Sequence, residues 1–307
     1  VIASYNTYPE FKQWNAMNMS RTAGFSIDSL ENSRPVEFDV ETPDQAEEMF
    51  DVLTYEKGST VLRMFQMFIG EEAFQNGVEA YLNKFKFANT NSSDLWDALS
   101  EASNQPLNKI LPFWIREKGY PFLQVDCSNN FLTIKQKPFL LKNVETDKNN
   151  IKPVPVQIKF LDTGNEEKFL LDEAERVVDL KNLGEVPHIN SGGWGFFHTF
   201  YDDEVFENIL ANFDKLNDLE KYRLLEDKWM QFKKAPTDIK DFYKFLMFFK
   251  KEKDEDIWIY MSSIIATIAN LFESNNSDSF KTFVRDLTDE LHNELGFEVK
   301  KDEELEI

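Results

Sequence analysis

The sequence predicts a multidomain protein in which a helical region is followed by a small β-sandwich and then by a second helical region. Three observations support this fold class. The chain has 307 residues, more than a single hydrophobic core usually fills. The spacing of apolar residues changes from a helical period to a period of two after Gly119-Tyr120-Pro121, and the helical period returns from Asp202. The predicted domains are residues 1–120, 121–201 and 202–307.

The first region, residues 1–120, carries apolar side chains at helical spacing with turn and cap signals between the segments. The clearest helix begins near Thr54, the candidate N-cap residue, and ends at Gly70. One face of this helix is apolar and consists of Val61, Leu62, Phe65, Phe68 and Ile69. A second helix is predicted directly after it, from Glu71 to Phe85.

The middle region, residues 121–201, contains short stretches with alternating or β-branched apolar residues. Two polar segments, Asn129-Asn130 and Thr163-Gly164-Asn165, are typical of hairpin turns. The predicted strands cover residues 122–125, 131–135, 154–160, 169–171 and 177–180. A small β-sandwich accounts for them most simply.

The last region, residues 202–307, regains the helical period and predicts successive helices in a superhelical all-α array. We expect this domain to be incomplete and its tail from Lys300 to be exposed to solvent. The chain also starts at Val1 in the middle of an apolar pattern and without a methionine, so we expect a fragment of a longer protein.

Composition excludes several classes of function. Lys and Arg total 34 against 55 Asp and Glu, a net charge of −21, and no basic cluster is present, so nucleic acid is not an expected partner. Apolar stretches such as Trp258–Phe272 are shorter than the ~20 residues of a membrane span, so no membrane association is predicted. Cys127 is the single cysteine, which favours a reducing, cytoplasmic location, and its alternating context is typical of a strand residue rather than a nucleophile.

The sequence lacks the common metal and phosphate motifs. Its three histidines, His188, His198 and His292, form no H-E-x-x-H pair, so we expect no metal ligands in this chain. The glycine-rich segment 191–195 lies between strand patterns and has no Lys-Ser/Thr ending, which indicates a turn rather than a phosphate loop.

The most informative segment is Phe50-Asp51-Val-Leu-Thr54-Tyr55-Glu56-Lys57-Gly58-Ser59. It resembles the F-D-x-[IV]-[ST]-Y-x-K-G-[AS] segment of the aminopeptidase N family of zinc metallopeptidases. These gluzincin aminopeptidases include puromycin-sensitive and tricorn-interacting members. Further segments resemble family landmarks in the same order, at residues 29–36, 70–82, 89–96, 114–121 and 195–202. Two positions depart from the family pattern: Arg34 replaces a frequent His, and His198 replaces an Arg.

The resemblance implies a fold and a function. Residues 1–120 would be the all-α end of a thermolysin-like catalytic domain, followed by the β-sandwich and a superhelical α-domain. The family's zinc ligands, H-E-x-x-H and a later glutamate, would then lie upstream of Val1. By its match to the family's catalytic tyrosine, Tyr55 is expected to donate a hydrogen bond to the oxyanion formed when zinc-activated water attacks the peptide carbonyl. The pattern alone favours a half-buried structural tyrosine, and the family match reverses that preference.

The neighbours of Tyr55 have structural explanations in the sequence. Gly58 would permit a close backbone approach, and Asp51 and Glu56 would complement the helix dipole. The predicted function is therefore zinc-dependent removal of N-terminal residues from peptides by the full-length protein, with this chain inactive alone. Peptides are the expected substrates, and a proteasome-like or tricorn-like protease system is the expected partner. The alternative is a non-enzymatic interaction module derived from the same family.

Overall fold

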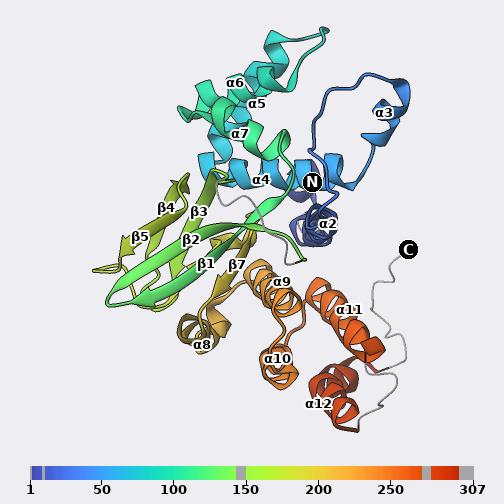
Figure 1. The fold of residues 1–307 in the computed structure, drawn as a ribbon, viewed down its shortest axis with the longest axis vertical. Coiled ribbons are helices and arrows are strands. Elements are labelled where there is room, and N and C mark those ends of the chain that lie inside the picture. The colour runs from blue at the N-terminus through green and yellow to red at the C-terminus, as the bar shows by residue number, and fades with distance from the viewer. Residues whose placement is uncertain (1, 9–10, 143–149, 272–277, 297–307) are drawn as a thin grey trace. The chain divides into compact units, whose positions relative to one another are not determined.

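The structure, a computed structural model, describes residues 2–8, 11–142, 150–271 and 278–296 (Figure 1). It contains two compact units, Val1–Lys234 and Ala235–Ile307. The predicted mixture of helices with a small β region is confirmed, and the strands form two small sheets within the first unit. The predicted tail from Lys300 lies outside the described residues.

The first unit opens with helices α1 (Ile2–Thr7), α2 (Gln13–Asp28) and α3 (Pro43–Glu48). A π-helical turn (Leu53–Lys57) then runs directly into α4 (Gly58–Ile69). The predicted end of this helix is confirmed, because Gly70 follows it with φ of 93°.

The start of this helix differs from the prediction. Thr54 is not the N-cap residue but lies inside the π-helical turn. Its amide donates to the Asp51 carboxylate at 3.0 Å, so the aspartate three residues earlier does the capping.

Helices α5 (Glu71–Lys84), α6 (Ser92–Ser103) and α7 (Leu107–Ile115) complete the first helical part. The helix predicted from Glu71 is confirmed to within one residue at its end. At the α5–α6 contact, a Cβ added to Gly77 would lie 2.9 Å from the Leu99 side chain, so the glycine lets the two helices approach closely. Trp114 of α7 is fully buried, and its indole donates to the Pro153 carbonyl at 2.8 Å.

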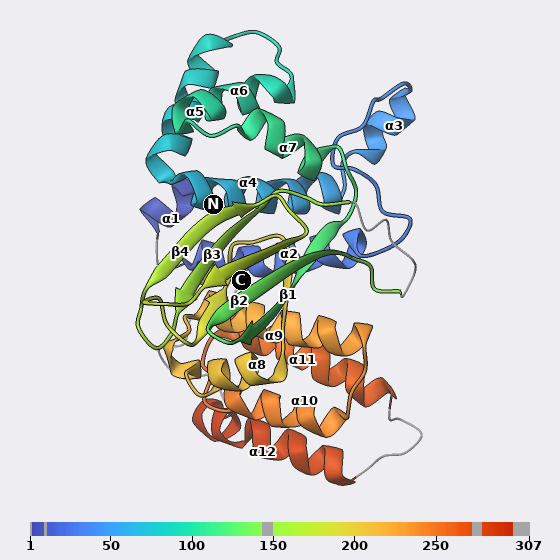
Figure 2. The same ribbon diagram turned by 60° about the vertical axis from the view of Figure 1, so that its left-hand side comes forward.

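The two sheets account for the predicted β region. The strands are β1 (Tyr120–Ser128), β2 (Phe131–Phe139), β3 (Val154–Phe160), β4 (Glu166–Leu171), β5 (Glu175–Asp179), β6 (Pro187–Ile189) and β7 (His198–Tyr201). One sheet has the order β5-β2-β1-β7 and the other β4-β3-β6. Figure 2 shows strands β1 to β4 of these sheets from a second side. Strands β1 and β7 pair in parallel, whereas the other pairs are antiparallel.

Local turns and one hydroxyl organise these sheets. Asn129 and Asn130 both have positive φ, 52° and 64°, which confirms the predicted hairpin turn between β1 and β2. The Tyr201 hydroxyl on β7 lies 2.9 Å from the Ile189 amide on β6, so a side chain of one sheet binds the backbone of the other. The glycine-rich segment forms a short 3₁₀ turn, η3 (Ser191–Gly193), as expected for a turn.

Three more elements complete the first unit: α8 (Asp203–Leu210), the 3₁₀ turn η4 (Phe213–Lys215) and α9 (Asp218–Lys234). The sequence predicts that they belong with the C-terminal helices, but they cluster with the strands and the first helices in the unit Val1–Lys234.

The second unit consists of α10 (Ile239–Leu246), the 3₁₀ turn η5 (Met247–Phe249), α11 (Glu255–Leu271) and α12 (Asp278–Leu295). Tyr243 of α10 stacks on Phe283 of α12 with ring centroids 4.3 Å apart. Among the described residues of both units, no helix is both long and apolar enough to cross a membrane.

Candidate active-site segment

Tyr55 lies in the middle of the π-helical turn that precedes α4. The turn is defined by the Gly58 amide, which donates to the Leu53 carbonyl five residues earlier. The Tyr55 residue is 56% exposed, and its hydroxyl has no hydrogen-bond partner among the residues that the structure describes. Its ring lies 6.3 Å from the exposed ring of Phe50. Single π-helical turns are rare and occur frequently at functional sites.

A buried ion pair lies on the inner side of the same turn. The Lys57 Nζ is 2.8 Å from the Asp28 Oδ2, and neither side chain is exposed to solvent. The same Nζ donates to the Gly119 carbonyl at 3.2 Å. Burial lowers the pKa of Lys57, while the negative charge of Asp28 opposes that shift and favours the ammonium form.

Asp28 is itself held in place by two donors. Its Oδ1 accepts from the Ser33 hydroxyl at 2.6 Å and from the Gly119 amide at 2.9 Å. The carboxylate therefore joins the end of α2 to the segment before β1, 91 residues later. Three of the motifs that carry the family resemblance, 29–36, 50–59 and 114–121, meet at this ion pair.

A second, more exposed group of contacts fixes the start of the turn. The Arg34 guanidinium is 2.6 Å from the Asp51 carboxylate and donates to the Thr54 hydroxyl at 3.2 Å. It also donates to the Pro35 carbonyl at 2.7 Å. The side chains of this ion pair are 24% and 37% exposed, so water screens the interaction. Arg34, which departs from the family pattern, therefore contacts the segment that leads to Tyr55.

The space around Gly58 differs from the prediction. A Cβ on Gly58 would meet the Val36 side chain at 3.7 Å, an ordinary contact, so the prediction that Gly58 permits a close backbone approach is wrong. Gly24 in α2 faces the same turn, and a Cβ there would lie 3.4 Å from the Lys57 amide nitrogen, which is also within ordinary contact distance.

The two histidines of the β region and Cys127 lie in buried or partly buried positions on strands. His188 and His198 are both buried strand residues, and burial lowers the pKa of each imidazole. Cys127 lies in β1, and burial, helped by the charge of Asp202, raises the pKa of its thiol to about 12. A thiol with that pKa stays protonated at neutral pH and is a poor nucleophile.

The described residues do not fit a zinc site. No group of three or more His, Cys, Asp or Glu side chains in ranges 2–8, 11–142, 150–271 and 278–296 is arranged to hold a metal ion. Within the described residues, the surroundings of Tyr55 therefore supply a hydroxyl and its support, but no cluster of three metal-ligating side chains.

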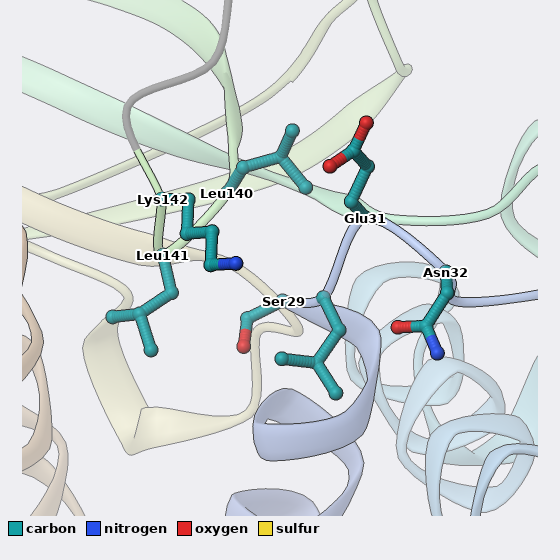
Figure 3. A pocket seen from close by; sticks show the side chains of 7 residues that line it. Ser29, Glu31, Asn32, Leu140, Leu141 and Lys142 are labelled. Atoms are coloured by element: carbon teal, nitrogen blue, oxygen red, sulfur yellow. The ribbon is translucent and has the colours of Figure 1, made fainter.

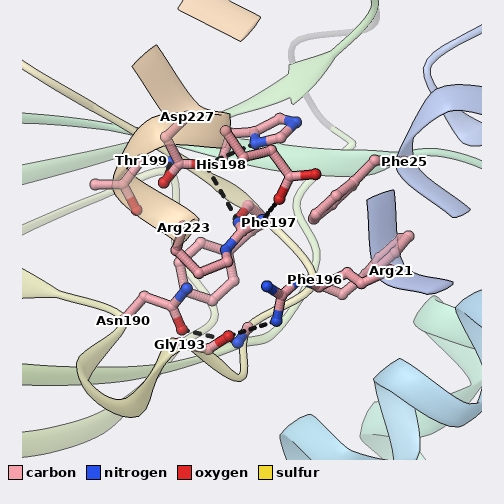
Figure 4. A network of polar contacts seen from close by, with 12 residues as sticks. Arg21, Phe25, Asn190, Gly193, Phe196, Phe197, His198, Thr199, Arg223 and Asp227 are labelled. Atoms are coloured by element: carbon pink, nitrogen blue, oxygen red, sulfur yellow. Dashed lines mark hydrogen bonds and ion pairs between the residues drawn. The ribbon is translucent and has the colours of Figure 1, made fainter. Parts of the chain in front are cut away.

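A larger polar cluster, which the sequence did not predict, lies between α2, β7 and α9 (Figure 4). We call it the polar junction and define it by Arg21, His198, Arg223, Glu226 and Asp227. Arg223 forms ion pairs with Glu226 and with Asp227, the latter at 3.2 Å, and donates to the Phe197 carbonyl at 2.5 Å. The His198 Nδ1 is 2.7 Å from Asp227.

Arg21 extends the polar junction to α2. Its guanidinium donates to the Gly193 carbonyl at 2.5 Å, and Arg223 lies over the Phe25 ring one turn further along the same helix. Burial, reinforced by the positive charge of Arg223, lowers the pKa of Arg21 to about 9. The one sequence signal for this cluster was His198 in place of the family's Arg, and its partner Asp227 carried none.

Two pockets are formed by residues that the structure describes. One, of about 470 Å³, is lined by residues 29–32 after α2 and by Leu140, Leu141 and Lys142 after β2 (Figure 3). Another, of about 570 Å³, lies along α4 and α5 and includes Gln66, Glu71 and Leu82. Tyr55 lines neither pocket.

Comparison with known proteins assigns the two ends of the chain. Residues 2–114 match the Peptidase family M1 domain, and residues 188–307 match the ERAP1-like C-terminal domain. The first match contains Tyr55, the Lys57–Asp28 pair and the Arg34 contacts. The second begins at His188 in β6 and covers α8 to α12.

Curated relatives align with most of the chain. Tricorn protease-interacting factor F2 of Thermoplasma volcanium is 30% identical over 274 residues, which cover 88% of this chain and 33% of the relative. The puromycin-sensitive aminopeptidase of Caenorhabditis elegans is 30% identical over 304 residues, which cover 94% of this chain and 32% of the relative. The alanine/arginine aminopeptidase of Saccharomyces cerevisiae is 29% identical over 306 residues, which cover 97% of this chain and 35% of the relative.

The chain thus spans about one third of the length of the curated relatives it matches. The family resemblance seen in the motifs is confirmed by the domain matches at both ends and by these alignments. On that basis, the chain belongs to peptidase family M1.

Proposed function

We propose that this chain is part of a zinc-dependent aminopeptidase that removes N-terminal residues from peptides, and that Tyr55 stabilises the oxyanion of the reaction. The observation that carries the proposal is the Tyr55 side chain itself. Its hydroxyl is exposed and has no partner among the described residues, yet it lies on a π-helical turn fixed from inside by the Lys57–Asp28 pair. The names of the relatives support the reaction type.

The Tyr55 hydroxyl suits this role on physical grounds. A tyrosine hydroxyl ordinarily keeps its proton at neutral pH, so it can donate a hydrogen bond. As the carbonyl oxygen of the cleaved peptide bond gains negative charge, that hydrogen bond strengthens. A donor already in place needs no reorganisation, and removing one such donor typically lowers kcat by about 10²- to 10³-fold.

The zinc ion is proposed to be held by residues of the full-length protein that precede this chain. When bound there, zinc would polarise the carbonyl and lower the pKa of a bound water. The absence of a suitable ligand cluster among the described residues is the reason for placing the metal elsewhere.

The domain division is also a proposal. Residues 1–120 would be the all-α end of a thermolysin-like catalytic domain, 121–201 a β-sandwich and 202–307 an incomplete helical domain. The order of the elements supports the division, since seven strands in two sheets stand between two groups of helices in the described chain. A cytoplasmic location and a tricorn-like protease system as partner are supported by the lone cysteine and by the name of the Thermoplasma relative.

Substitution of Tyr55 in the full-length protein tests the proposal. Tyr55→Phe is expected to lower kcat for aminoacyl reporter substrates by about 10²- to 10³-fold while zinc content stays unchanged. Tyr8→Phe is the matched control, because Tyr8 is similarly exposed at 50% but lies outside the segment. An unchanged kcat in Tyr55→Phe would remove the tyrosine from the mechanism.

A second experiment addresses the non-enzymatic alternative, which the names of the relatives do not favour. The isolated chain, supplied with zinc, is expected to show no hydrolysis of aminoacyl substrates, whereas the full-length protein turns them over. If the full-length protein is inactive as well, with zinc bound, an interaction module becomes the better description.

A further inference from the structure

We propose that the buried ion pair of Lys57 and Asp28 positions the Tyr55 hydroxyl for the reaction. This inference rests on the proposed function and adds two positioning residues to it. Neither side chain is exposed, so neither is proposed to touch the substrate.

The connection between the pair and Tyr55 is short. Lys57 follows Tyr55 by two residues in the same five-residue turn, and the two side chains differ sharply in exposure, from fully buried to 56%. A turn held by a side chain on its inner side cannot rotate without moving the side chain on its outer side. The place of the Lys57 ammonium therefore fixes the direction in which Tyr55 leaves the backbone.

The acceptors of the Lys57 ammonium are themselves immobilised. Asp28 is held by Ser33 and by the Gly119 amide, and the Gly119 carbonyl is a further acceptor of Lys57. Gly119 thus contacts both members of the pair, through its amide and its carbonyl. The ammonium is therefore fixed against a carboxylate that is itself held in place and against a backbone carbonyl.

The competing contacts around the turn are weaker anchors. The Arg34–Asp51 pair is partly exposed, and such pairs contribute little because water and salt screen them. Apolar packing alone would tolerate small sliding of the turn, since it has no directional requirement. A buried charge requires its partner at a defined place, because leaving it unpaired is strongly unfavourable. The Lys57–Asp28 pair is therefore the contact with the strictest geometry.

The test is a double-mutant cycle in the full-length protein. The pair is changed together, as Lys57→Met with Asp28→Asn, so that no unpaired charge stays buried. The amide oxygen of the new side chain can still accept from Ser33 and Gly119. The expected result is a fall in kcat of about 10- to 100-fold with a much smaller change in KM, since a misplaced catalytic group mainly affects the transition state.

The same double change is then made in the Tyr55→Phe background. If the pair acts through the Tyr55 hydroxyl, the further loss of kcat there is expected to be less than about threefold. An equal loss in both backgrounds would overturn the proposal, as would an unchanged kcat in the presence of Tyr55. If Tyr55→Phe alone has no effect, the proposed function fails instead, and the positioning role fails with it.

Lys152→Met is the matched control for this cycle. Lys152 is another buried lysine, 3% exposed, that donates to a carbonyl, that of Phe113 at 2.5 Å, and it pairs with Glu117 at 3.3 Å. It lies outside the Tyr55 turn, so we expect kcat to stay near wild type even if thermal stability falls. A loss of kcat equal to that of the pair would show that any buried lysine has the same effect and would overturn the proposal.

A milder variant keeps the test decisive if the doubly changed protein does not fold. Ser33→Ala removes one hydrogen bond to Asp28 and leaves both charges in place. We expect a several-fold loss of kcat with Tyr55 present and none in the Tyr55→Phe background. No loss with Tyr55 present would count against the pair as a positioning device.

Discussion

The two buried polar clusters of the first unit differ in where their hydrogen bonds lead. The Lys57–Asp28 pair lies under an exposed hydroxyl and binds mainly backbone groups of one segment. The polar junction, by contrast, joins three elements through four charged side chains and a histidine, all of them buried. No exposed side chain with an unpaired polar group belongs to it.

The difference shows that buried charge alone does not mark a functional site. Both clusters shift pKa values by burial, as Lys57 and Arg21 illustrate. The feature that separates them is a neighbouring polar group directed to solvent, which the first cluster has in Tyr55. The polar junction is accordingly expected to govern stability, and the pair under Tyr55 to govern catalysis.

The largest loss of stability that would test this comparison is expected when Arg223 is replaced. Arg223→Met leaves Glu226 and Asp227 buried without their cation, which should cost about 3–5 kcal/mol. Native-state hydrogen exchange of α9 amides measures the change as a lower free energy of opening. Arg116→Met is the control, since Arg116 is 62% exposed in its pair with Glu37 and should cost under about 1 kcal/mol. Equal effects in the two variants would break the comparison.

A smaller effect is expected from one hydroxyl at the edge of the polar junction. The Thr22 hydroxyl donates to Glu226 at 2.5 Å. Thr22→Val keeps the shape but removes this hydrogen bond to a charged group, at a cost of about 1.5–3 kcal/mol in the free energy of unfolding. Thr267→Val is the control, because the Thr267 hydroxyl is exposed and donates only to a carbonyl of its own helix. Its free energy of unfolding, measured with urea, should change by less than about 0.5 kcal/mol.

A fall in pH is expected to lower the free energy of unfolding through the buried histidines of the β region. Burial lowers the pKa of His188 and His198 in the folded state, so the unfolded chain binds protons first as pH falls. Stability from this source is fully present above the unfolded pKa of about 6.5 and is lost as pH falls from there toward the folded values. Each histidine contributes a slope of up to about 1.4 kcal/mol per pH unit.

The histidine contribution can be isolated by comparing the pH dependence of unfolding between pH 7.5 and 5.5 in two proteins. His188→Leu should show a shallower slope than the wild type, because one of the two proton-binding differences is gone. The same slope in both proteins would show that carboxylates, and not the buried imidazoles, set the acid response.

The smallest effect is expected at the partly exposed contacts before Tyr55. Arg34→His restores the residue that is frequent in the family and removes the ion pair with Asp51. Because water screens that pair, the free energy of unfolding measured by thermal denaturation should change by no more than about 1 kcal/mol. A larger loss would show that the start of the π-helical turn is held more firmly than its exposure suggests.

The sequence predicted those parts of the fold that depend on near neighbours. The end of α4 at Gly70 and the turn at Asn129-Asn130 follow from local backbone preferences. Tyr55 was found through a contiguous motif, although its role is still a prediction. Long-range hydrogen bonds to carboxylates were not predictable, because Asp28 meets Gly119 across 91 residues and Thr22 meets Glu226 across 204. No periodicity in one segment reports on a contact at that separation.

The double use of Gly119 has a consequence for the order of folding. A protein made on the ribosome orders its N-terminal parts first. Yet Gly119, which contacts both members of the Lys57–Asp28 pair, is synthesised 64 residues after Tyr55. Until then Lys57 and Asp28 lack the two backbone contacts that Gly119 supplies. The segment just before β1 thus completes the support of the candidate active-site segment in time as well as in space.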